Sequence, residues 1–491
     1  RDGGDAGDGD RQRRAGDRLR RERAMTGEPM SCLEIAAAVQ SGERTARDVV
    51  EHALAEAERL QEKWRAFITL TPEVARRQAD EVDALVRRGR KLPLAGVPVA
   101  VKDLIDIKGV RTTCGSKVFA DRVAGSNATV IEKLMAAGAV PLGKTNMHEF
   151  AFGFTGENPT FGDCRNPWDP ARISGGSSSG SAVAVALGIC PVALGSDTGG
   201  SIRLPAALCG LVGLKPTYGR VSRAGVAPLS WSMDHVGPLT RTAEEAALVL
   251  EVLAGEDPAD ETSSRRPVPQ YAGELEKPLR GLKIGLPRTG FFESLEPDVA
   301  QALVTASVEL ASLGAERVEI TLPHLDEVLG AHRAIIFSEA SSYHQPFLKD
   351  RADRYGEATR LQLEAGLFLP AVDYLKGQRV RRVVRRAWAE VFRSVDCLLT
   401  PASQAVAARF GAEAVELPGG KTPLLYAYLG LLLPFNLSGH PALAAGCGFS
   451  QDGLPIGMQL VGRPFDEATI LRVAYQYQQK SEWHRRTPPV S

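Results

Sequence analysis

Hydrophobic and polar positions along the chain switch repeatedly between helical spacing and short apolar runs. Two segments, Ser31–Glu34 and Thr45–Asp48, have the S/T-x-x-E/D form of a helix start and lead into apolar residues at helical spacing. Short apolar runs bounded by turn residues are typical of buried strands. The pattern predicts helices that begin at 31 and over 45–60, 72–89, 127–137, 179–187, 242–253 and 297–313, and strands over 96–101, 139–142, 191–194, 282–286 and 318–322.

This alternation predicts an α/β fold with a large, mixed, mostly parallel twisted sheet and helices on both of its faces. We expect one domain over 29–485, with a core of 60–255 and 436–480 and a helical, substrate-side region of about 290–430. The polar, proline-rich segment 255–280 is expected to be a surface connection. Residues 1–28 are charged and Gly-rich without an apolar run, which favours a disordered tail over a signal peptide.

Composition narrows the classes of partner. The chain has 491 residues, 44% of them hydrophobic, so it can bury a large core. Its formal net charge is zero, so no overall electrostatic field attracts it to nucleic acid or to a membrane. The most apolar run, 424–435, is too short to cross a bilayer and is expected to form core or pocket wall. The seven cysteines are scattered without a C-x-x-C pair, which argues against a disulfide framework and a zinc cluster. We therefore expect a cytoplasmic protein that uses neither metal nor cofactor.

Two Gly/Ser turns that flank an apolar segment carry the strongest chemical signal. They lie at 174–181 and 195–201, and such turns can bring two hydroxyls and bare backbone N–H groups to one point. That arrangement suits attack on a carbonyl. Lys102 stands at the end of the strand predicted over 96–101, where desolvation would lower its pKa and leave a neutral amine able to accept a proton.

A Ser-His-Asp triad is the alternative, because Gly176–Gly180 matches the G-x-S-x-G elbow with Ser178 as its serine. The motif is loose and arises easily within a run of Gly and Ser. The chain has eight histidines, none of which stands in a comparable Gly-rich turn: His52, His148, His235, His324, His332, His344, His440 and His484.

Lys102, the Ser177 turn and the string GSDTGGSIRLPAALCGLVGLKPTYGRVSR at 195–223 together resemble the amidase signature family, and the resemblance extends from about Leu33 to Tyr477. It implies a Ser-cisSer-Lys triad in an amidase-signature fold, with Ser201 as nucleophile, Ser177 as the bridging serine after a cis peptide bond, and Lys102 as general base. The implied oxyanion hole consists of the N–H groups of Thr198, Gly199, Gly200 and Ser201.

The resemblance and the local pattern assign supporting roles to other residues. Ser178 and Asp197 are expected to orient the relay through hydrogen bonds, although Asp197 could equally cap the local turn. Arg203 is interpreted as a structural ion-pairing residue. Cys190 and Cys209 are interpreted as packed thiols.

Several apolar and aromatic residues are candidates for a substrate pocket, although such residues are more often core: Met147, Phe150, Phe152, Phe154, Trp231, Tyr426, Tyr428 and Leu429. This lining favours a serine hydrolase acting on linear aryl or alkyl amides, with carbamates (urethanes) and esters also open to the same acyl-enzyme chemistry. The expected partner is such a small amide or carbamate, with no nucleic acid and no membrane, and a homodimer is a further expectation.

The alternative within the family is the glutamine-hydrolysing A subunit of a tRNA-dependent amidotransferase. That protein has an acidic residue shortly before its Asn-Leu-Ala-Gly segment, where the ammonium of glutamine needs a partner. This chain has Tyr428, Leu429 and Gly430 followed by three leucines before Asn436–Gly439. The departure favours a stand-alone amidase.

Overall fold

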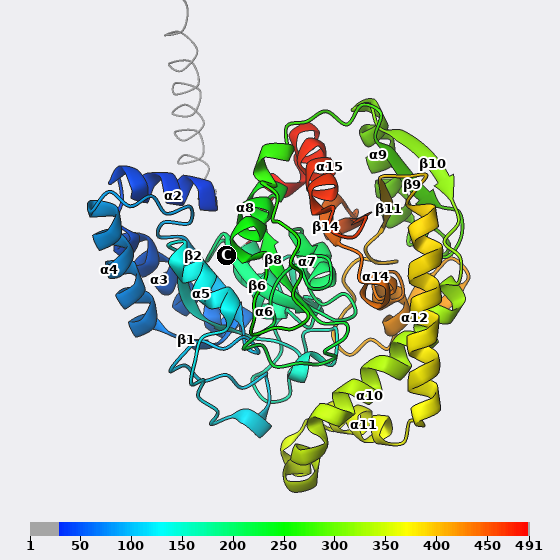
Figure 1. The fold of residues 1–491 in the computed structure, drawn as a ribbon, viewed down its shortest axis with the longest axis horizontal. Coiled ribbons are helices and arrows are strands. Elements are labelled where there is room, and N and C mark those ends of the chain that lie inside the picture. The colour runs from blue at the N-terminus through cyan, green and yellow to red at the C-terminus, as the bar shows by residue number, and fades with distance from the viewer. Residues whose placement is uncertain (1–28, 490–491) are drawn as a thin grey trace, which may run out of the picture.

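An eleven-stranded sheet runs through the molecule in the computed structural model, which describes residues 29–489 (Figure 1). The tail predicted over 1–28 lies outside the described residues. In spatial order the strands are β1 (Phe67–Leu70), β3 (Val140–Thr145), β2 (Pro98–Lys102), β6 (Val192–Asp197), β8 (His235–Thr240), β7 (Val212–Lys215), β14 (Ala442–Phe449), β15 (Pro455–Gly462), β11 (Cys397–Pro401), β9 (Lys283–Pro287) and β10 (Glu316–Ile320).

The sheet is mixed, and its parallel pairs form two separate blocks. Strands β3, β2 and β6 are parallel neighbours, as are β11, β9 and β10. The strands between the two blocks pair antiparallel, and β1 adds an antiparallel edge. The predicted α/β class and mixed sheet are therefore confirmed, with the parallel pairing confined to the blocks on either side of an antiparallel centre.

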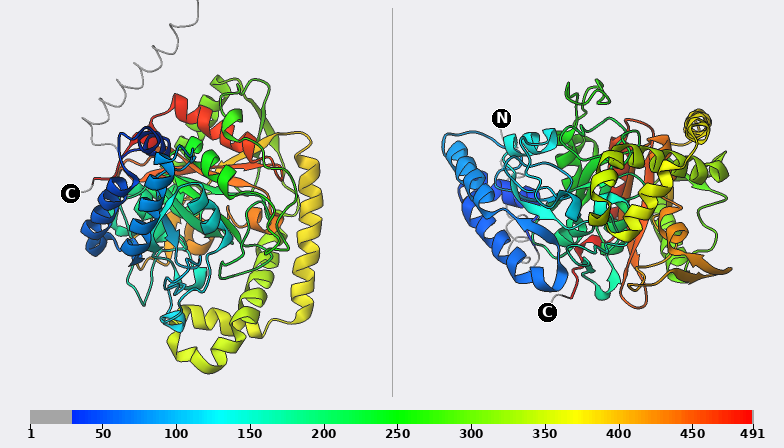
Figure 2. Two further views of the ribbon diagram at one scale, coloured as in Figure 1. Left: turned by 60° about the vertical axis from the view of Figure 1, so that its left-hand side comes forward. Right: turned by 90° about the horizontal axis from the view of Figure 1, so that it is seen from below.

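Helices cover both faces of the sheet (Figure 2). Their bounds are α2 (Cys32–Ser41), α3 (Ala46–Trp64), α4 (Pro72–Arg87), α5 (Thr129–Ala136), α6 (Ser179–Ala186), α7 (Arg203–Cys209), α8 (Ala243–Leu253), α9 (Pro297–Ser312), α10 (Leu325–Arg351), α11 (Glu357–Leu367), α12 (Ala371–Val391), α13 (Leu424–Leu429), α14 (Pro434–Ser438) and α15 (Glu467–Lys480). Short 3-10 helices are η1 (Lys117–Phe119), η2 (Glu149–Ala151), η3 (Ala272–Glu274), η4 (Ala352–Arg354) and η5 (Trp483–Arg485), and two-stranded sheets form from β4 (Arg165–Asn166) with β5 (Asp169–Ile173) and β12 (Ala414–Leu417) with β13 (Gly420–Pro423).

Helix starts follow the capping chemistry predicted from the sequence. Ser31 accepts a hydrogen bond from the Glu34 N–H while the Glu34 side chain accepts from the Ser31 N–H, which completes a capping box. Thr45 caps α3 through the Asp48 N–H. Each cap satisfies backbone donors that the first helical turn leaves without partners.

Helix α10 packs against both α11 and α12 at one side of the molecule (Figures 1 and 2). No helix of the described residues is both long and apolar enough to cross a membrane. All seven cysteines lie in the described part of the chain, where they are buried and free of disulfide bonds.

The two parallel strands β2 and β6 fix the position of the predicted chemistry. Both strands are fully buried, and their carboxyl ends, Lys102 and Asp197, lie at the same edge of the sheet. The turns that lead into α6 and α7 reach this edge, and the two helices pack on each other. Ligands of α/β folds bind at such strand ends.

Candidate active site

Lys102 ends β2 as a fully buried side chain that contacts three serines. Its Nζ atom lies 2.7 Å from Ser177 Oγ, 2.9 Å from Ser178 Oγ and 2.9 Å from Ser196 Oγ. Desolvation lowers the pKa of Lys102 from 10.5 to about 7, and the charges of Asp197 and Asp234 only partly oppose that effect. The amine can therefore be neutral near neutral pH.

Lys102 Nζ contacts the three hydroxyls as a hydrogen-bond donor, and a neutral amine keeps two N–H groups and one lone pair for these three partners. Ser178 Oγ donates to the Ser196 carbonyl oxygen at 3.1 Å, so it meets Lys102 as an acceptor. Ser196 Oγ accepts a second amine N–H. With both N–H groups of the neutral amine engaged, the remaining lone pair can accept the Ser177 hydroxyl proton.

Ser177 is held in the turn between β5 and α6. The Gly176–Ser177 peptide bond is cis, and the Ser177 carbonyl accepts a hydrogen bond from the His148 N–H at 3.2 Å. The next residue connects this turn to the second one, because the Ser178 N–H donates to the Ser201 carbonyl at 3.2 Å. Lys102, Ser177 and the Ser201 loop are thus brought to one place.

Ser201 lies in the turn between β6 and α7, where Gly200 has a φ of 127°. Side chains rarely tolerate this φ, and a Cβ on Gly200 would also lie 2.6 Å from Leu432 Cδ1. Among the described residues, the N–H groups of Thr198, Gly199 and Ser201 have no protein acceptor, and all three residues line a cavity. They are available to an oxyanion.

The Gly200 N–H, in contrast, already has an acceptor within the protein. It donates to Asp197 Oδ1 at 2.9 Å, so this member of the predicted oxyanion hole is already engaged. Asp197 also accepts from the Ile202 N–H at 3.1 Å. The Asp197 carboxylate thus binds the backbone of the Ser201 loop, and no hydrogen bond to Ser177 or Ser178 is formed by it.

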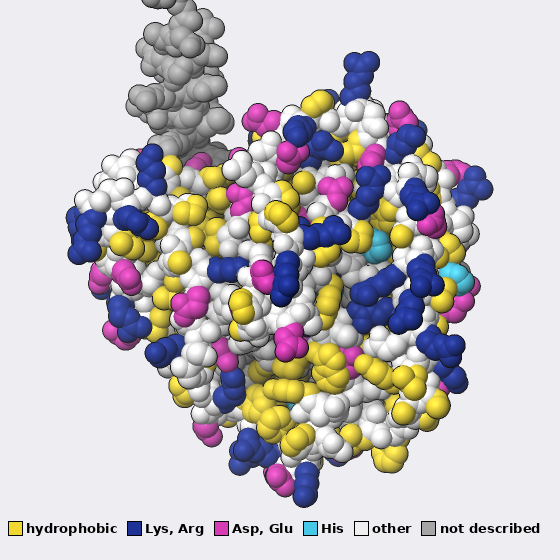
Figure 3. All heavy atoms as spheres, viewed as in Figure 1, with side chains coloured by type: hydrophobic (Ala, Val, Ile, Leu, Met, Phe, Trp, Pro, Cys, Tyr) yellow, Lys and Arg dark blue, Asp and Glu magenta, His cyan; other side chains and the backbone are white. Residues whose placement is uncertain are grey.

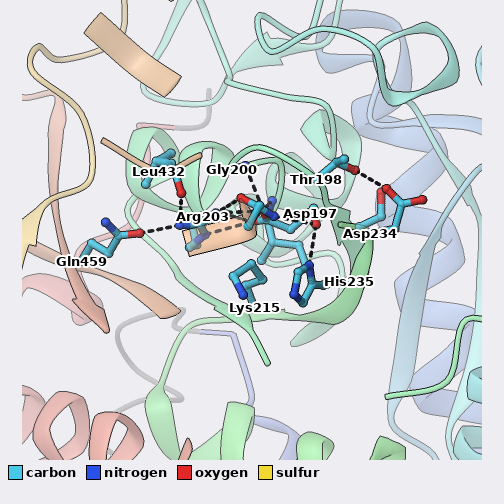
Figure 4. A network of polar contacts seen from close by, with 12 residues as sticks. Asp197, Thr198, Gly200, Arg203, Lys215, Asp234, His235, Leu432 and Gln459 are labelled. Atoms are coloured by element: carbon cyan, nitrogen blue, oxygen red, sulfur yellow. Dashed lines mark hydrogen bonds and ion pairs between the residues drawn. The ribbon is translucent and has the colours of Figure 1, made fainter. Parts of the chain in front are cut away.

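Asp197 is part of a buried ionic network that joins distant segments (Figure 4). Arg203 Nη2 lies 2.9 Å from Asp197 Oδ1, and both side chains are fully buried. Arg203 also donates to Gln459 Oε1 and Asn436 Oδ1, each at 2.6 Å. Burial alone would raise the pKa of Asp197, but Arg203 holds it far below its usual range.

A second acidic contact supports the other side of the loop. Asp234 accepts from Thr198 Oγ1 at 2.6 Å, and burial raises the pKa of Asp234 to about 6. His332 of α10 lies 3.0 Å from the Thr198 carbonyl oxygen through Nε2. Burial lowers the pKa of His332 to about 4, so this imidazole is neutral at neutral pH and donates from Nε2.

No imidazole among the described residues takes the place that an elbow mechanism requires. The hydroxyl groups of Ser177 and Ser178 bond to Lys102 and to the Ser196 carbonyl. His148 approaches this turn through its backbone, and burial together with the Lys102 charge lowers its pKa to about 4. The geometry favours the lysine relay over Ser178 as nucleophile.

A cavity of about 340 Å³ opens onto Ser201. Apolar side chains from several elements form most of its wall: Phe152, Phe154, Leu229, Leu329, Ile336, Phe337, Leu425, Leu429 and Leu433. Polar side chains are Thr198, Ser201, His332, Arg333 and Gln362. The apolar run 424–435 therefore supplies pocket wall, through Leu425 and Leu429 of α13 and through Leu433, which precedes α14.

Only part of the predicted substrate lining reaches this cavity. Phe152, Phe154 and Leu429 line it, whereas Tyr426 is exposed and does not. Met147 is fully buried, and Phe150 packs edge-on against His344 with ring centroids 4.3 Å apart. Tyr428 points into the core, where its hydroxyl donates to the Val406 carbonyl at 2.6 Å.

Trp231 lies at a neighbouring cavity of about 270 Å³. That cavity shares Ala151 and Leu229 with the one over Ser201. A single sequence cannot distinguish these placements, since an aromatic residue near a catalytic turn suits core and pocket equally. Sequence reasoning also missed Ser196, which stood inside the second Gly/Ser turn, and Gln459, which carried no local signal.

Comparison with known proteins places this site in a family. The Amidase family model matches residues 48–471. The A subunit of the glutamyl-tRNA(Gln) amidotransferase of Moorella thermoacetica is 44% identical over 450 residues, which cover 87% of this chain and 91% of that protein. These findings favour the alternative prediction, a component of an amidotransferase, over the more specific prediction of an aryl or alkyl amidase.

Solved structures agree on the family. A structure described as revealing a vestigial protein complex and the evolutionary origins of an s-triazine catabolic enzyme has a TM-score of 0.88 and 40% identity, covering 92% of this chain and 99% of that one. The A subunit of the glutamyl-tRNA(Gln) amidotransferase of Thermotoga maritima has a TM-score of 0.76 and 35% identity, covering 89% and 92%. The chain therefore belongs to the amidase signature family of hydrolases that act on carbon–nitrogen bonds.

Proposed function

We propose that this chain hydrolyses an amide through an acyl-enzyme on Ser201. The observation that carries the proposal is the buried Lys102 amine, which lies 2.7 Å from Ser177 Oγ with its pKa lowered to about 7. A base with a pKa near the working pH can both accept a proton and return it. The Ser178 N–H donates to the Ser201 carbonyl oxygen at 3.2 Å, which holds the turn of Ser177 against the loop that carries Ser201.

The reaction divides into two mirrored steps. Ser201 Oγ bonds to the carbonyl carbon, its proton passes to Ser177, and the Ser177 proton passes to Lys102. The oxyanion forms against the N–H groups of Thr198, Gly199 and Ser201, each worth about 10²–10³ in rate when removed. When the C–N bond breaks, the proton returns through Ser177 to the leaving nitrogen. Water then attacks the acyl-enzyme by the same relay and releases the acid.

Two substrate classes follow from different observations. Glutamine is favoured by the relatives named as the A subunit of glutamyl-tRNA(Gln) amidotransferase, which implies partner subunits in place of a homodimer and tRNA as a further participant. An amide that carries no ammonium is favoured by the cavity, since none of the described residues that line it is Asp or Glu. Carbamates and esters fit the acyl-enzyme chemistry but gain no support from the comparisons. The cytoplasmic location stays a prediction.

The test is a hydrolysis panel of anilides, aliphatic amides, carbamates, esters and glutamine, combined with labelling by a fluorophosphonate probe. We expect wild-type labelling that Ser201→Ala abolishes, and no loss in Ser312→Ala, which changes an exposed serine of α9. Glutamine cleavage that rises with amidotransferase partner subunits and tRNA would support the role in that complex. Wild-type protein that neither labels nor cleaves any amide would refute the proposal.

A further inference from the structure

The cavity over Ser201 has one charged side chain in its wall within the part of the chain that the structure describes. Arg333 of α10 contributes a guanidinium, and no Asp or Glu of residues 29–489 lines the cavity. Gln362 of α11 adds a neutral amide. The rest of the wall is mostly aromatic and aliphatic, so a charge on a bound molecule meets Arg333 before any other charged group.

Arg333 has no ionic or hydrogen-bond partner in the described part of the chain, and its side chain is exposed. Some other arginines of this helical region do have partners. Arg360 pairs with Glu364, and Arg385 donates to the Ser438 carbonyl oxygen. Arg333 is thus an uncompensated cation that faces a ligand cavity.

The cavity leads from a buried hydroxyl to this exposed cation. Ser201 is 6% exposed, and Phe152 is buried beside it in the wall. Arg333 follows His332, whose Nε2 contacts the Thr198 carbonyl, so α10 crosses directly over the nucleophile loop. On the face seen in Figure 3, hydrophobic side chains gather over α10 and α11, the helices that carry Arg333 and Gln362.

Resting on the function proposed above, we propose that Arg333 binds a carboxylate at the far end of the acyl chain, so that the site takes monoamides of dicarboxylic acids. The scissile amide lies at Ser201, the methylene chain lies along the apolar wall, and the carboxylate receives N–H groups from the guanidinium fork. An ammonium group beside that carboxylate would be repelled by the positive charge of Arg333. The described residues of the wall include no Asp or Glu that could pair with it. Glutamine is therefore a poorer ligand than glutaric acid monoamide, which differs from it only by lacking the ammonium group.

The experiment measures binding apart from turnover. Ser201→Ala protein is titrated calorimetrically with three matched five-carbon amides: glutaric acid monoamide, pentanamide and glutamine. Six- and eight-carbon monoamides and alkyl amides extend the series in length. We expect tighter binding of the monoamide than of the alkyl amide at one or more lengths, and a preference that shrinks with added salt.

Variants of Arg333 assign the preference to this side chain. Arg333→Met in the Ser201→Ala background is expected to weaken monoamide binding by about 10- to 100-fold and alkyl amide binding by less than about twofold. Arg333→Lys should retain part of the preference, because it keeps the charge without the fork. Arg379→Met, a change of an exposed arginine of α12 outside the cavity, is the matched control.

The possible outcomes of these titrations test the Arg333 inference separately from the proposed amide hydrolysis. Equal binding of monoamide and alkyl amide at every length, or equal weakening of both by Arg333→Met, would overturn the inference. Tighter binding of glutamine than of glutaric acid monoamide would also overturn it. A monoamide preference in binding without any wild-type turnover would uphold the inference and refute the proposed function.

Discussion

The pH dependence of Ser201 reactivity tests the lysine relay most directly. Lys102 must be neutral to accept a proton, so reactivity should be lost as pH falls through its pKa and reach a plateau above it. With the pKa of Lys102 at about 7, the rate should be about half of its plateau at pH 7 and about a tenth at pH 6. An ordinary lysine would give a rate still rising tenfold per pH unit toward about pH 10.

The size of the effect follows from the burial of the amine. One pKa unit corresponds to about 1.4 kcal/mol, so lowering the pKa of Lys102 from 10.5 to about 7 corresponds to about 5 kcal/mol of net desolvation. The charges of Asp197 and Asp234 favour the protonated amine, so this figure is what remains of the desolvation after they have offset part of it.

The assay is the rate of fluorophosphonate labelling from about pH 5 to about pH 10, for wild type and for Lys102→Met. The variant should label about 10²–10⁴ times more slowly and without the inflection near neutrality. Its fold is checked by circular dichroism. A wild-type inflection that persists in Lys102→Met, or a wild-type rate that climbs steadily to high pH, would refute the reasoning.

Three further substitutions probe the loop around the nucleophile. Ser178→Ala removes one acceptor from Lys102 and should slow labelling by up to about tenfold, whereas complete loss would favour the elbow mechanism. Asp197→Asn leaves Arg203 buried without a counter-charge and should lower the free energy of unfolding by about 3–5 kcal/mol in urea titrations; a loss below about 1 kcal/mol would contradict the ionic network. Gly200→Ala forces a Cβ against Leu432 and should reduce labelling by up to about 100-fold, a result that unchanged labelling would exclude.

Much of the fold follows from local pattern. The strand predicted over 96–101 is β2 (Pro98–Lys102), and the helix predicted over 297–313 is α9 (Pro297–Ser312). Capping residues and short apolar runs determine such boundaries within a few neighbouring residues. The antiparallel centre of the sheet could not be predicted from local pattern, because strand order and direction depend on contacts between distant segments.

The candidate site, like the fold, was predictable from the sequence only in part. Lys102, Ser177 and Ser201 carry signals of their own, namely a lysine at a strand end and serines in Gly-rich turns. The engagement of the Gly200 N–H by Asp197 depends on the local turn geometry, which residue types alone do not specify. Arg333 reaches the cavity only because α10 folds back over the nucleophile loop, a placement that no local pattern encodes.

The ionic network around Arg203 makes the Ser201 loop depend on segments that come much later in the chain. Arg203 emerges from the ribosome long before Gln459, its acceptor 256 positions further on. Until that acceptor has been synthesised and docked, the guanidinium lacks part of its support and the loop lacks its final anchor. A polypeptide that ends before Asn436 still contains Lys102, Ser177 and Ser201 but lacks two side-chain acceptors of Arg203, Asn436 and Gln459.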